Sequence, residues 1–179
     1  MKIKYVNLKN QYKIERQKLL AVIDKALSSG QYVGGDEVIK FEKKISSLLK
    51  VKECVALNSG TDALTLGLHA IGVRRGDEVI TTPNSFIAST AVIVHLGAKP
   101  VFVDVKPDQC IDPNLIEKAI TSKTAAIMAV HLTGRMCEMD KIMALSKKYK
   151  IPVIEDAAQS IGSKYQNKFS GSVGSIGCF

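Results

Sequence analysis

Apolar segments of strand length alternate with amphipathic stretches through most of this chain, and this alternation limits the possible fold more than any single motif does. Segments typical of strands buried between layers span residues 53–57, 78–82, 100–105, 124–130 and 151–154. Helical spacing of apolar residues separates them over residues 64–71, 87–94, 112–120 and 138–149. Such strand-helix units predict an α/β fold, with a mostly parallel sheet, helices on both faces and right-handed crossovers.

Two helices are predicted ahead of the first strand. Apolar residues fit one helical face over residues 11–29, and Asp36 caps a second helix that runs to about residue 48. Because both precede every predicted strand, we expect them to pack outside the sheet or onto another subunit. After the last helix-strand unit, residues 162–172 are typical of a surface hairpin or loop, and residues 173–179 form a strand-like run.

Composition is that of a soluble globular domain. The 179 residues are 46% apolar and 23% charged, and no apolar run reaches the roughly 18 residues of a membrane helix. The net charge of +8 favours an anionic small molecule, whereas the scattered lysines argue against a nucleic-acid partner. The polar amino terminus lacks the pattern of a signal peptide, so we predict a cytoplasmic location without membrane attachment.

The cysteines are widely separated in the sequence. They are Cys54, Cys110, Cys137 and Cys178. No Cys-x-x-Cys pair and no histidine at zinc-ligand spacing accompanies them, so we expect neither a metal site nor a disulfide framework. Free and mostly buried thiols are predicted.

Two carboxylates, Glu155 and Asp156, end the apolar run that begins at residue 151. Ligands of open parallel sheets bind beyond the carboxyl ends of the strands, so an acidic group there is positioned to meet a ligand. The small pair that follows leaves room for a flat molecule, and Gln159 can both donate and accept hydrogen bonds beside it. Alternatively, Asp156 caps the next segment or pairs with a basic side chain.

Two further segments follow predicted strands. Ser59, Gly60 and Thr61 lie between a strand and a helix, where free amides and hydroxyls favour a phosphate, although Ser59 and Thr61 could simply be helix caps. Phe86 follows the next strand and could stack on a ligand or lie in the core. The P-loop and dinucleotide fingerprints are both absent. A planar, phosphorylated, cationic heterocycle would use the anion site, the aromatic face and the carboxylate together.

Several motifs, in this order and spacing, resemble those of one enzyme family. They are NSGTDAL at 58–64, TPNSFIA at 82–88, VFVDV at 101–105, VHLTG at 130–134 and EDAAQS at 155–160. From end to end, the chain resembles the DegT/DnrJ/EryC1/StrS family of pyridoxal-phosphate-dependent nucleotide-sugar aminotransferases. The fold implied is the large domain of fold-type I, aspartate-aminotransferase-like enzymes.

The resemblance also implies a cofactor site. Gly60 and Thr61, with Ser59 beside them, would hold the phosphate of pyridoxal 5'-phosphate, and Phe86 would stack on its pyridine ring. Asp156 would pair with the ring nitrogen, and Gln159 would contact the 3-hydroxyl. This agrees with the chemistry of the residues, because the cofactor withdraws electrons best when its ring nitrogen is protonated, and a buried aspartate favours that form.

By the same resemblance, the catalytic lysine that holds the cofactor as a Schiff base is expected just beyond Phe179. The chain would be an incomplete cofactor-binding large domain, with leading helices at 11–50 and a sheet domain at 51–179, lacking the small carboxyl-terminal domain. Lys164 and Lys168 are expected in an exposed polar loop, where their amines would be poor nucleophiles.

The activity implied is transfer of an amino group from glutamate to a keto-sugar linked to a nucleoside diphosphate, in a homodimer with shared active sites. The alternatives are a sugar dehydratase with histidine in place of the lysine, and a non-catalytic regulatory or truncated module. Thr133, where the family more often has an aromatic residue, and Arg135 could bear on the choice of sugar. His131 is interpreted as a structural, hydrogen-bonded histidine rather than a catalytic base.

Overall fold

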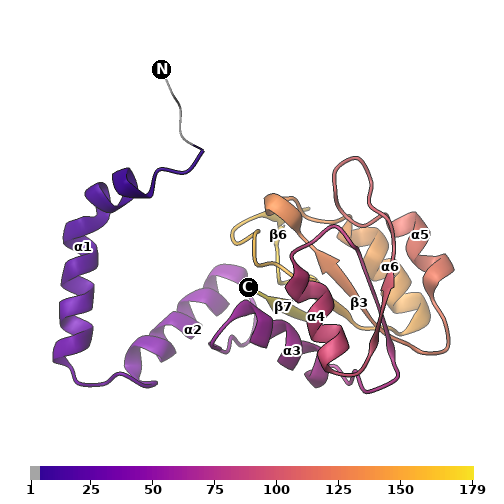
Figure 1. Cartoon of the computed structure of the whole chain (residues 1–179), viewed down its shortest axis with the longest axis horizontal. Coiled ribbons are helices and arrows are strands. Elements are labelled where there is room, and N and C mark those ends of the chain that lie inside the picture. Colours follow the sequence, from indigo (N-terminus) through magenta and orange to yellow (C-terminus); the bar gives the residue numbers. More distant parts are fainter. Residues whose placement is uncertain (1–4) are drawn as a thin grey trace.

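The computed structural model describes residues 5–179, which form a parallel sheet covered by helices on both faces (Figure 1). The sheet has five strands in the order β2-β1-β3-β4-β7, and every neighbouring pair is parallel. The strands are Glu78–Thr81 (β1), Lys99–Phe102 (β2), Thr124–Val130 (β3), Val153–Asp156 (β4) and Ile176–Cys178 (β7). The predicted fold class is therefore confirmed.

Two helix layers bury the two faces of the sheet. One layer contains α3 (Gly60–Ala70) and α4 (Ile87–His95), and the other contains α5 (Pro113–Ala119) and α6 (Met139–Tyr149). Consecutive residues of β4 alternate between the layers, since Ile154 packs against the first and Val153 against the second. Burial on both faces explains why the central strands are apolar without interruption.

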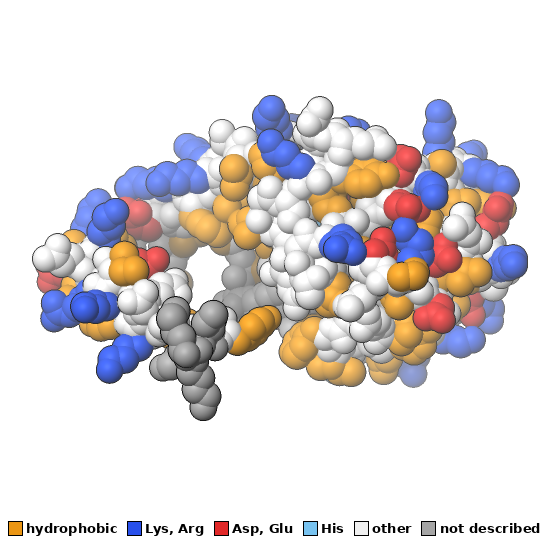
Figure 2. All heavy atoms as spheres, turned by 90° about the horizontal axis from the view of Figure 1, so that it is seen from above, with side chains coloured by type: hydrophobic (Ala, Val, Ile, Leu, Met, Phe, Trp, Pro, Cys, Tyr) orange, Lys and Arg blue, Asp and Glu red, His pale blue; other side chains and the backbone are white. Residues whose placement is uncertain are grey.

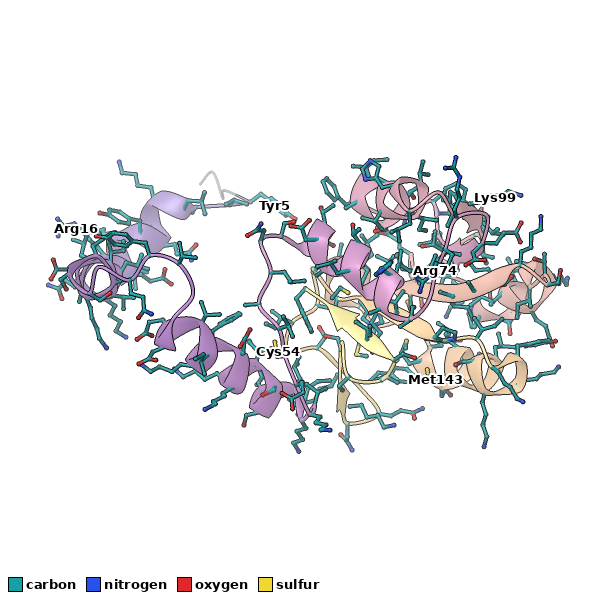
Figure 3. The ribbon with its side chains drawn as sticks, turned by 90° about the horizontal axis from the view of Figure 1, so that it is seen from below. Tyr5, Arg16, Cys54, Arg74, Lys99 and Met143 are labelled. Atoms are coloured by element: carbon teal, nitrogen blue, oxygen red, sulfur yellow. The ribbon has the colours of Figure 1, made fainter. Side chains whose placement is uncertain are left out.

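The leading helices, α1 (Leu8–Ser28) and α2 (Asp36–Leu49), lie outside the sheet as expected. No residue of α1 is buried, and its apolar side chains, including Leu19, Leu20 and Ile23, are exposed. In Figure 3 the side chains of α1, where Arg16 is labelled, extend into solvent at a distance from the sheet domain.

The predicted strand at 53–57 is wrong. No part of this segment pairs with a strand, and Val55 is 71% exposed. The amide of Ala56 instead donates to a carboxylate oxygen of Glu42 on α2, at 2.8 Å. The apolar composition resembled that of a strand, but strand formation requires a neighbouring backbone to bond with. This segment pairs with neither edge strand of the sheet, β2 or β7.

Other boundaries changed less. The strand predicted at 100–105 ends at Phe102, and the strand-like run at 173–179 pairs only over Ile176–Cys178. The predicted surface hairpin is confirmed as the antiparallel pair Lys164–Tyr165 (β5) and Lys168–Phe169 (β6). A short 3-10 helix, Leu132–Gly134 (η1), follows β3.

Surface charge and the thiols agree with the sequence-based predictions. Figure 2 shows Lys and Arg side chains spread over the visible face, with Asp and Glu between them on the sheet domain. All the cysteines are free thiols, and Cys110, Cys137 and Cys178 are buried. Within residues 5–179, none of the helices is both long and apolar enough to cross a membrane.

Candidate functional site

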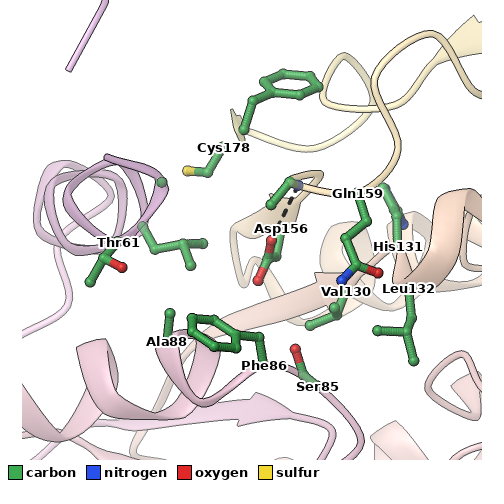
Figure 4. Close-up of a pocket in the computed structure, with 14 residues that line it drawn as sticks. Thr61, Ser85, Phe86, Ala88, Val130, His131, Leu132, Asp156, Gln159 and Cys178 are labelled. Atoms are coloured by element: carbon green, nitrogen blue, oxygen red, sulfur yellow. Dashed lines mark hydrogen bonds between the residues drawn. The ribbon is translucent and has the colours of Figure 1, made fainter. Parts of the chain in front are cut away.

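A cavity of about 210 Å³ lies where the carboxyl ends of β3, β4 and β7 meet the amino-terminal ends of α3 and α4 (Figure 4). This is the edge at which ligands of open α/β sheets bind. The sequence-predicted residues that line it are Gly60, Thr61, Phe86, Asp156 and Gln159. Segments nearly 100 residues apart in the chain thus contribute to one cavity.

Asp156 is the last residue of β4 and is 8% exposed. The hydroxyl of Ser89 donates to Oδ2 of Asp156 at 2.6 Å, and the amide of Ala158 donates to Oδ1 at 3.3 Å. In the part of the chain that the structure describes, no lysine, arginine or histidine forms an ion pair with Asp156. A nearly buried carboxylate without a cation is suited to accept a hydrogen bond from a positively charged ligand.

Ser89 is a site residue that the sequence analysis missed. It is fully buried on α4, and its hydroxyl also lies 2.7 Å from the hydroxyl of Ser85, which lines the cavity. Ser85, Ser89 and Asp156 therefore form a chain of hydrogen bonds from the cavity wall to the carboxylate. The available signal was a serine at a buried position of a largely apolar helix, since buried hydroxyls require a partner.

The amino-terminal end of α3 forms one end of the cavity. Ser59 is its N-cap, and the side-chain oxygen accepts a hydrogen bond from the amide of Asp62 at 3.1 Å, so the capping interpretation of Ser59 is confirmed. The first amides of a helix have no partner within the helix, and those of Gly60 and Thr61 belong to this group. A Cβ added at Gly60 would lie 3.2 Å from the backbone carbonyl oxygen of Phe179, so glycine allows the two backbones to approach closely here.

Phe86 is the N-cap residue of α4, lines the cavity and is 69% exposed. Figure 4 shows the ring between α4 and the cavity, beside Ala88. The alternative that Phe86 lies in the core is therefore wrong. An exposed aromatic face on a cavity wall can stack on a planar ligand.

Gln159 lines the cavity on the side opposite α3, and its carbonyl oxygen accepts a hydrogen bond from the amide of Thr133 at 2.7 Å. That bond fixes the side-chain amide, so its NH₂ group is the part left to donate to a ligand. Thr133 has a left-handed backbone, with φ of 56°.

Thr133 and Arg135 line a separate, open groove with Lys164, beside the β5-β6 hairpin. Lys164 and Lys168 are both exposed, as expected.

His131 and Glu155 form a buried pair, and both are 0% exposed. Nε2 of His131 lies 2.8 Å from Oε2 of Glu155. The amide of Cys137 donates to Nδ1, so the ring hydrogen is assigned to Nε2, which donates to Glu155. His131 is thus buried and hydrogen-bonded, as expected, although it also belongs to the cavity lining. That it is structural rather than a catalytic base stays a prediction. Glu155 does not meet a ligand at the strand end as Asp156 can, because successive side chains of a strand point to opposite faces.

Glu155 is held as a carboxylate. Burial alone would raise its pKa, but the hydrogen bonds from His131 and from the amides of Gly174 and Gly171 outweigh burial and lower the pKa below its ordinary value of 4.5.

A depressed carboxyl pKa makes stability depend on pH. The contribution of Glu155 is complete above its unfolded-state pKa of about 4.5 and is lost as the pH falls through the lower folded-state value. Glu155→Gln is expected to lower the free energy of unfolding by on the order of 3 kcal/mol at pH 7. Between neutral and acidic pH, the free energy of unfolding of this variant should fall less than that of the original protein. Urea unfolding at several pH values measures this. The exposed Glu117→Gln is the control, and an unchanged pH slope in Glu155→Gln would contradict the prediction.

The sequence signature of the DegT/DnrJ/EryC1/StrS aminotransferase family matches residues 13–179. Among curated relatives, UDP-2-acetamido-2-deoxy-3-oxo-D-glucuronate aminotransferase of Pseudomonas aeruginosa is 42% identical over 98% of this chain and 49% of its own. A pleiotropic regulatory protein of Geobacillus stearothermophilus is 41% identical over 100% of this chain and 48% of its own. The chain spans about half the length of the curated relatives it matches.

Solved structures agree with these relatives. Streptomyces venezuelae DesV, crystallised with a ketimine intermediate, superposes with a TM-score of 0.92 at 37% identity, over 95% of this chain and 46% of that one. The Bacillus subtilis protein NtdA, crystallised with the bound cofactor PMP, gives a TM-score of 0.88 at 37% identity, over 95% of this chain and 40% of that one. The sheet and helices described above therefore match the fold of pyridoxal-phosphate sugar aminotransferases.

Proposed function

Because the chain belongs to the DegT/DnrJ/EryC1/StrS aminotransferase family, we propose that it binds pyridoxal 5'-phosphate and transfers an amino group from glutamate to a nucleotide-linked keto-sugar. The observation that carries the proposal is Asp156, a nearly buried carboxylate that faces a cavity without a cation partner among residues 5–179. Two relatives support the proposal. The Pseudomonas aeruginosa relative is named an aminotransferase, and NtdA was crystallised with bound PMP.

The residues around the cavity fit this cofactor. The amino-terminal end of α3, with Ser59, Gly60 and Thr61, would hold the phosphate, since helix amides and hydroxyls favour an anion. Phe86 would stack on the pyridine ring, and the NH₂ group of Gln159 would donate to the 3-hydroxyl. When bound, the cofactor supplies an electron sink for reactions at the amino-bearing carbon.

Asp156 has the central role among these residues. Its carboxylate would accept a hydrogen bond from the ring nitrogen and keep the proton there, and the bond from Ser89 fixes the orientation of the carboxylate. The apolar wall formed by Leu64, Ala88 and Val130 limits the access of water and strengthens this interaction. Within the proposal, residues 1–179 are the cofactor-binding large domain, and the Schiff-base lysine and the small domain follow Phe179.

The direct test is spectroscopic and chemical. We expect the purified full-length protein to bind pyridoxal 5'-phosphate, to lose the absorption of the bound aldehyde on addition of glutamate, and to yield an aminated nucleotide sugar by mass spectrometry. A deoxygenated product without added nitrogen would instead identify the sugar dehydratase. The residue at the lysine position beyond Phe179 separates these two enzymes before any assay.

A second candidate is a non-catalytic regulatory protein on the same scaffold. The observation that favours it is the printed name of one relative, a pleiotropic regulatory protein. Absence of cofactor binding by the full-length protein, with an intact fold, would favour this candidate over both enzymes.

Ser89→Ala is expected to lower turnover about tenfold while leaving the fold intact. The substitution removes one hydrogen bond to a charged group, worth about 1.5–3 kcal/mol, from the carboxylate that holds the ring proton. Steady-state kinetics of the full-length protein measure the effect. Ser122→Ala, at an exposed position, is the matched control, and equal activity of both variants would remove Ser89 from the site.

We propose a homodimer whose active sites use both subunits. Exposed apolar side chains on α1, namely Tyr12, Leu19, Leu20, Ile23 and Leu27, support an interface, because a solvated helix of this kind gains little from folding alone. A two-fold symmetric dimer is the commonest closed assembly. Light scattering of the full-length protein is expected to give twice the subunit mass, and an active monomer would refute the proposal.

A further inference from the structure

Glu155 is a fully buried carboxylate that the proposed reaction does not use. Its side chain leaves β4 on the face opposite to that of Asp156, so it lies behind the sheet as seen from the cavity. A buried charge is costly unless every lone pair finds a donor. The donors that surround Glu155 therefore indicate what the charge holds in place.

Four N–H groups converge on the two oxygens of Glu155. Oε1 accepts from the amides of Val173 and Gly174, at 2.7 and 2.6 Å. Oε2 accepts from the amide of Gly171 at 2.9 Å and from His131 at 2.8 Å. We call these five residues the Glu155 cluster. It joins β4 to the loop that precedes β7 and to the turn that follows β3.

The loop end of the Glu155 cluster supports one wall of the cavity. Gly171 packs so closely against the ring of Phe179 and the backbone of Gly177 that an added Cβ would overlap the ring. Phe179 and Cys178 both line the cavity. The position of Gly171, which Glu155 fixes, thus determines where β7 and Phe179 lie.

The histidine end supports the opposite wall. His131 is followed by the turn in which the amide of Thr133 donates to the side-chain oxygen Oε1 of Gln159. The backbone amide of His131 also donates to the carbonyl oxygen of Asp156 at 3.0 Å. The Glu155 cluster therefore connects both walls of the cavity from behind the sheet.

We propose that Glu155 is a positioning residue that fixes β7 and the β3 turn relative to each other and so sets the shape of the cofactor cavity. The inference rests on the proposed function only in naming the cofactor. In addition to its contribution to overall stability, Glu155 controls the position of the cavity walls, and this second effect is the one that the experiment isolates.

The chemistry of glutamine makes a sharp test. Glutamine is nearly the same size, but its single oxygen can accept from only one pair of the four donors. Its NH₂ group would then face two further N–H groups. If His131 moved its ring hydrogen to Nδ1, Nε2 could accept from this NH₂ group, but the amides of Gly171 and Cys137 would both lose their acceptors. Glu155→Gln should thus release one end of the Glu155 cluster without creating a cavity.

Cys178 reports the position of β7 without any assay of activity. It is 3% exposed, and its thiol donates to the carbonyl oxygen of Ala63 at 3.3 Å. Burial, followed by the charges of Asp156 and Glu155, raises the pKa of Cys178 to about 12. Alkylation of Cys178 should therefore be slow unless β7 separates from α3.

The experiment measures the alkylation rate of Cys178 in the full-length protein by iodoacetamide and peptide mass spectrometry, together with the Kd for pyridoxamine 5'-phosphate, which needs no lysine to bind. Glu155→Gln is expected to increase the rate and the Kd at least tenfold. Glu155→Asp keeps the charge, but its side chain is too short to reach all four donors. A faster alkylation of Cys178 in this variant therefore cannot be an effect of lost charge on the thiol. Glu155→Asp also decides the test if Glu155→Gln does not fold. The control is Ile142→Val or Ile142→Ala, at a buried position on α6, whichever matches the loss of thermal stability. It is expected to leave both quantities unchanged.

Each result has a defined meaning. Unchanged alkylation of Cys178 in the folded Glu155 variants, or an equal increase in the Ile142 control, would overturn the positioning role. A protein that does not bind pyridoxamine 5'-phosphate at all would refute the proposed function, while the alkylation rates would still test the role of Glu155.

Discussion

Asp156→Asn in the full-length protein is expected to reduce turnover by at least about 100-fold while preserving the fold. The neutral amide has the same shape, so Ser89 can still bond to it, but it cannot hold a proton on a pyridine nitrogen. Loss of one charge-assisted contact accounts for about 1.5–3 kcal/mol, and the weaker withdrawal of electrons by the cofactor adds to this. Single-turnover rates with glutamate measure the chemical step directly.

The control for Asp156→Asn removes one negative charge elsewhere. Glu117→Gln does so on the far side of the sheet, where Glu117 pairs with Lys148 at the surface, and it should keep full activity. Near-normal turnover by Asp156→Asn with the cofactor bound would show that another group fulfils the role proposed for Asp156.

Gly177→Ala is expected to destabilise β7 and to weaken binding of pyridoxamine 5'-phosphate more than tenfold. A Cβ at this position would overlap the backbone of Gly171, which cannot move aside as a flexible side chain could. Overpacking of this kind typically costs about 1–3 kcal/mol. Because β7 carries one wall of the cavity, the displacement should reach the site. Thermal unfolding and calorimetric titration measure the two effects.

Gly72→Ala is the matched glycine control. Apart from its chain neighbours, no atom of residues 5–179 lies within 4 Å of a Cβ added there, although its φ of 99° is strained for alanine. It is expected to lower thermal stability modestly and to leave cofactor affinity unchanged. Equal effects of the two substitutions on affinity would show that the close contact between Gly171 and Gly177 does not shape the site.

The features that were predictable from sequence have local causes. Alternation of apolar strands with helical periods predicted the parallel sheet, because burial on both faces requires uninterrupted apolar strands such as β3. A strand that ends in Asp156, and a helix that begins at Gly60, placed two parts of the site at the same sheet edge. These inferences needed only the chain direction and the residue types.

The features that were missed depend on contacts distant in sequence. Residues 53–57 have the composition of a strand, yet whether a strand forms depends on a free edge beside it, which no local pattern reveals. Ser89 reaches Asp156 across 67 positions of the chain, and His131 reaches Glu155 across 24. Neither pair leaves a periodic signal.

Glu155 and Asp156 show the division most clearly. The sequence by itself determined that two carboxylates end a buried strand and that, by the pleat of the backbone, they point to opposite faces. The family resemblance singled out Asp156 for the ligand, but the residue types alone did not separate the two carboxylates. Only the tertiary structure showed that Asp156 lines the cavity and that Glu155 receives four N–H groups behind the sheet. The reason is physical, because the environment of a side chain is set by the segments that pack against it, and these are brought together only by folding.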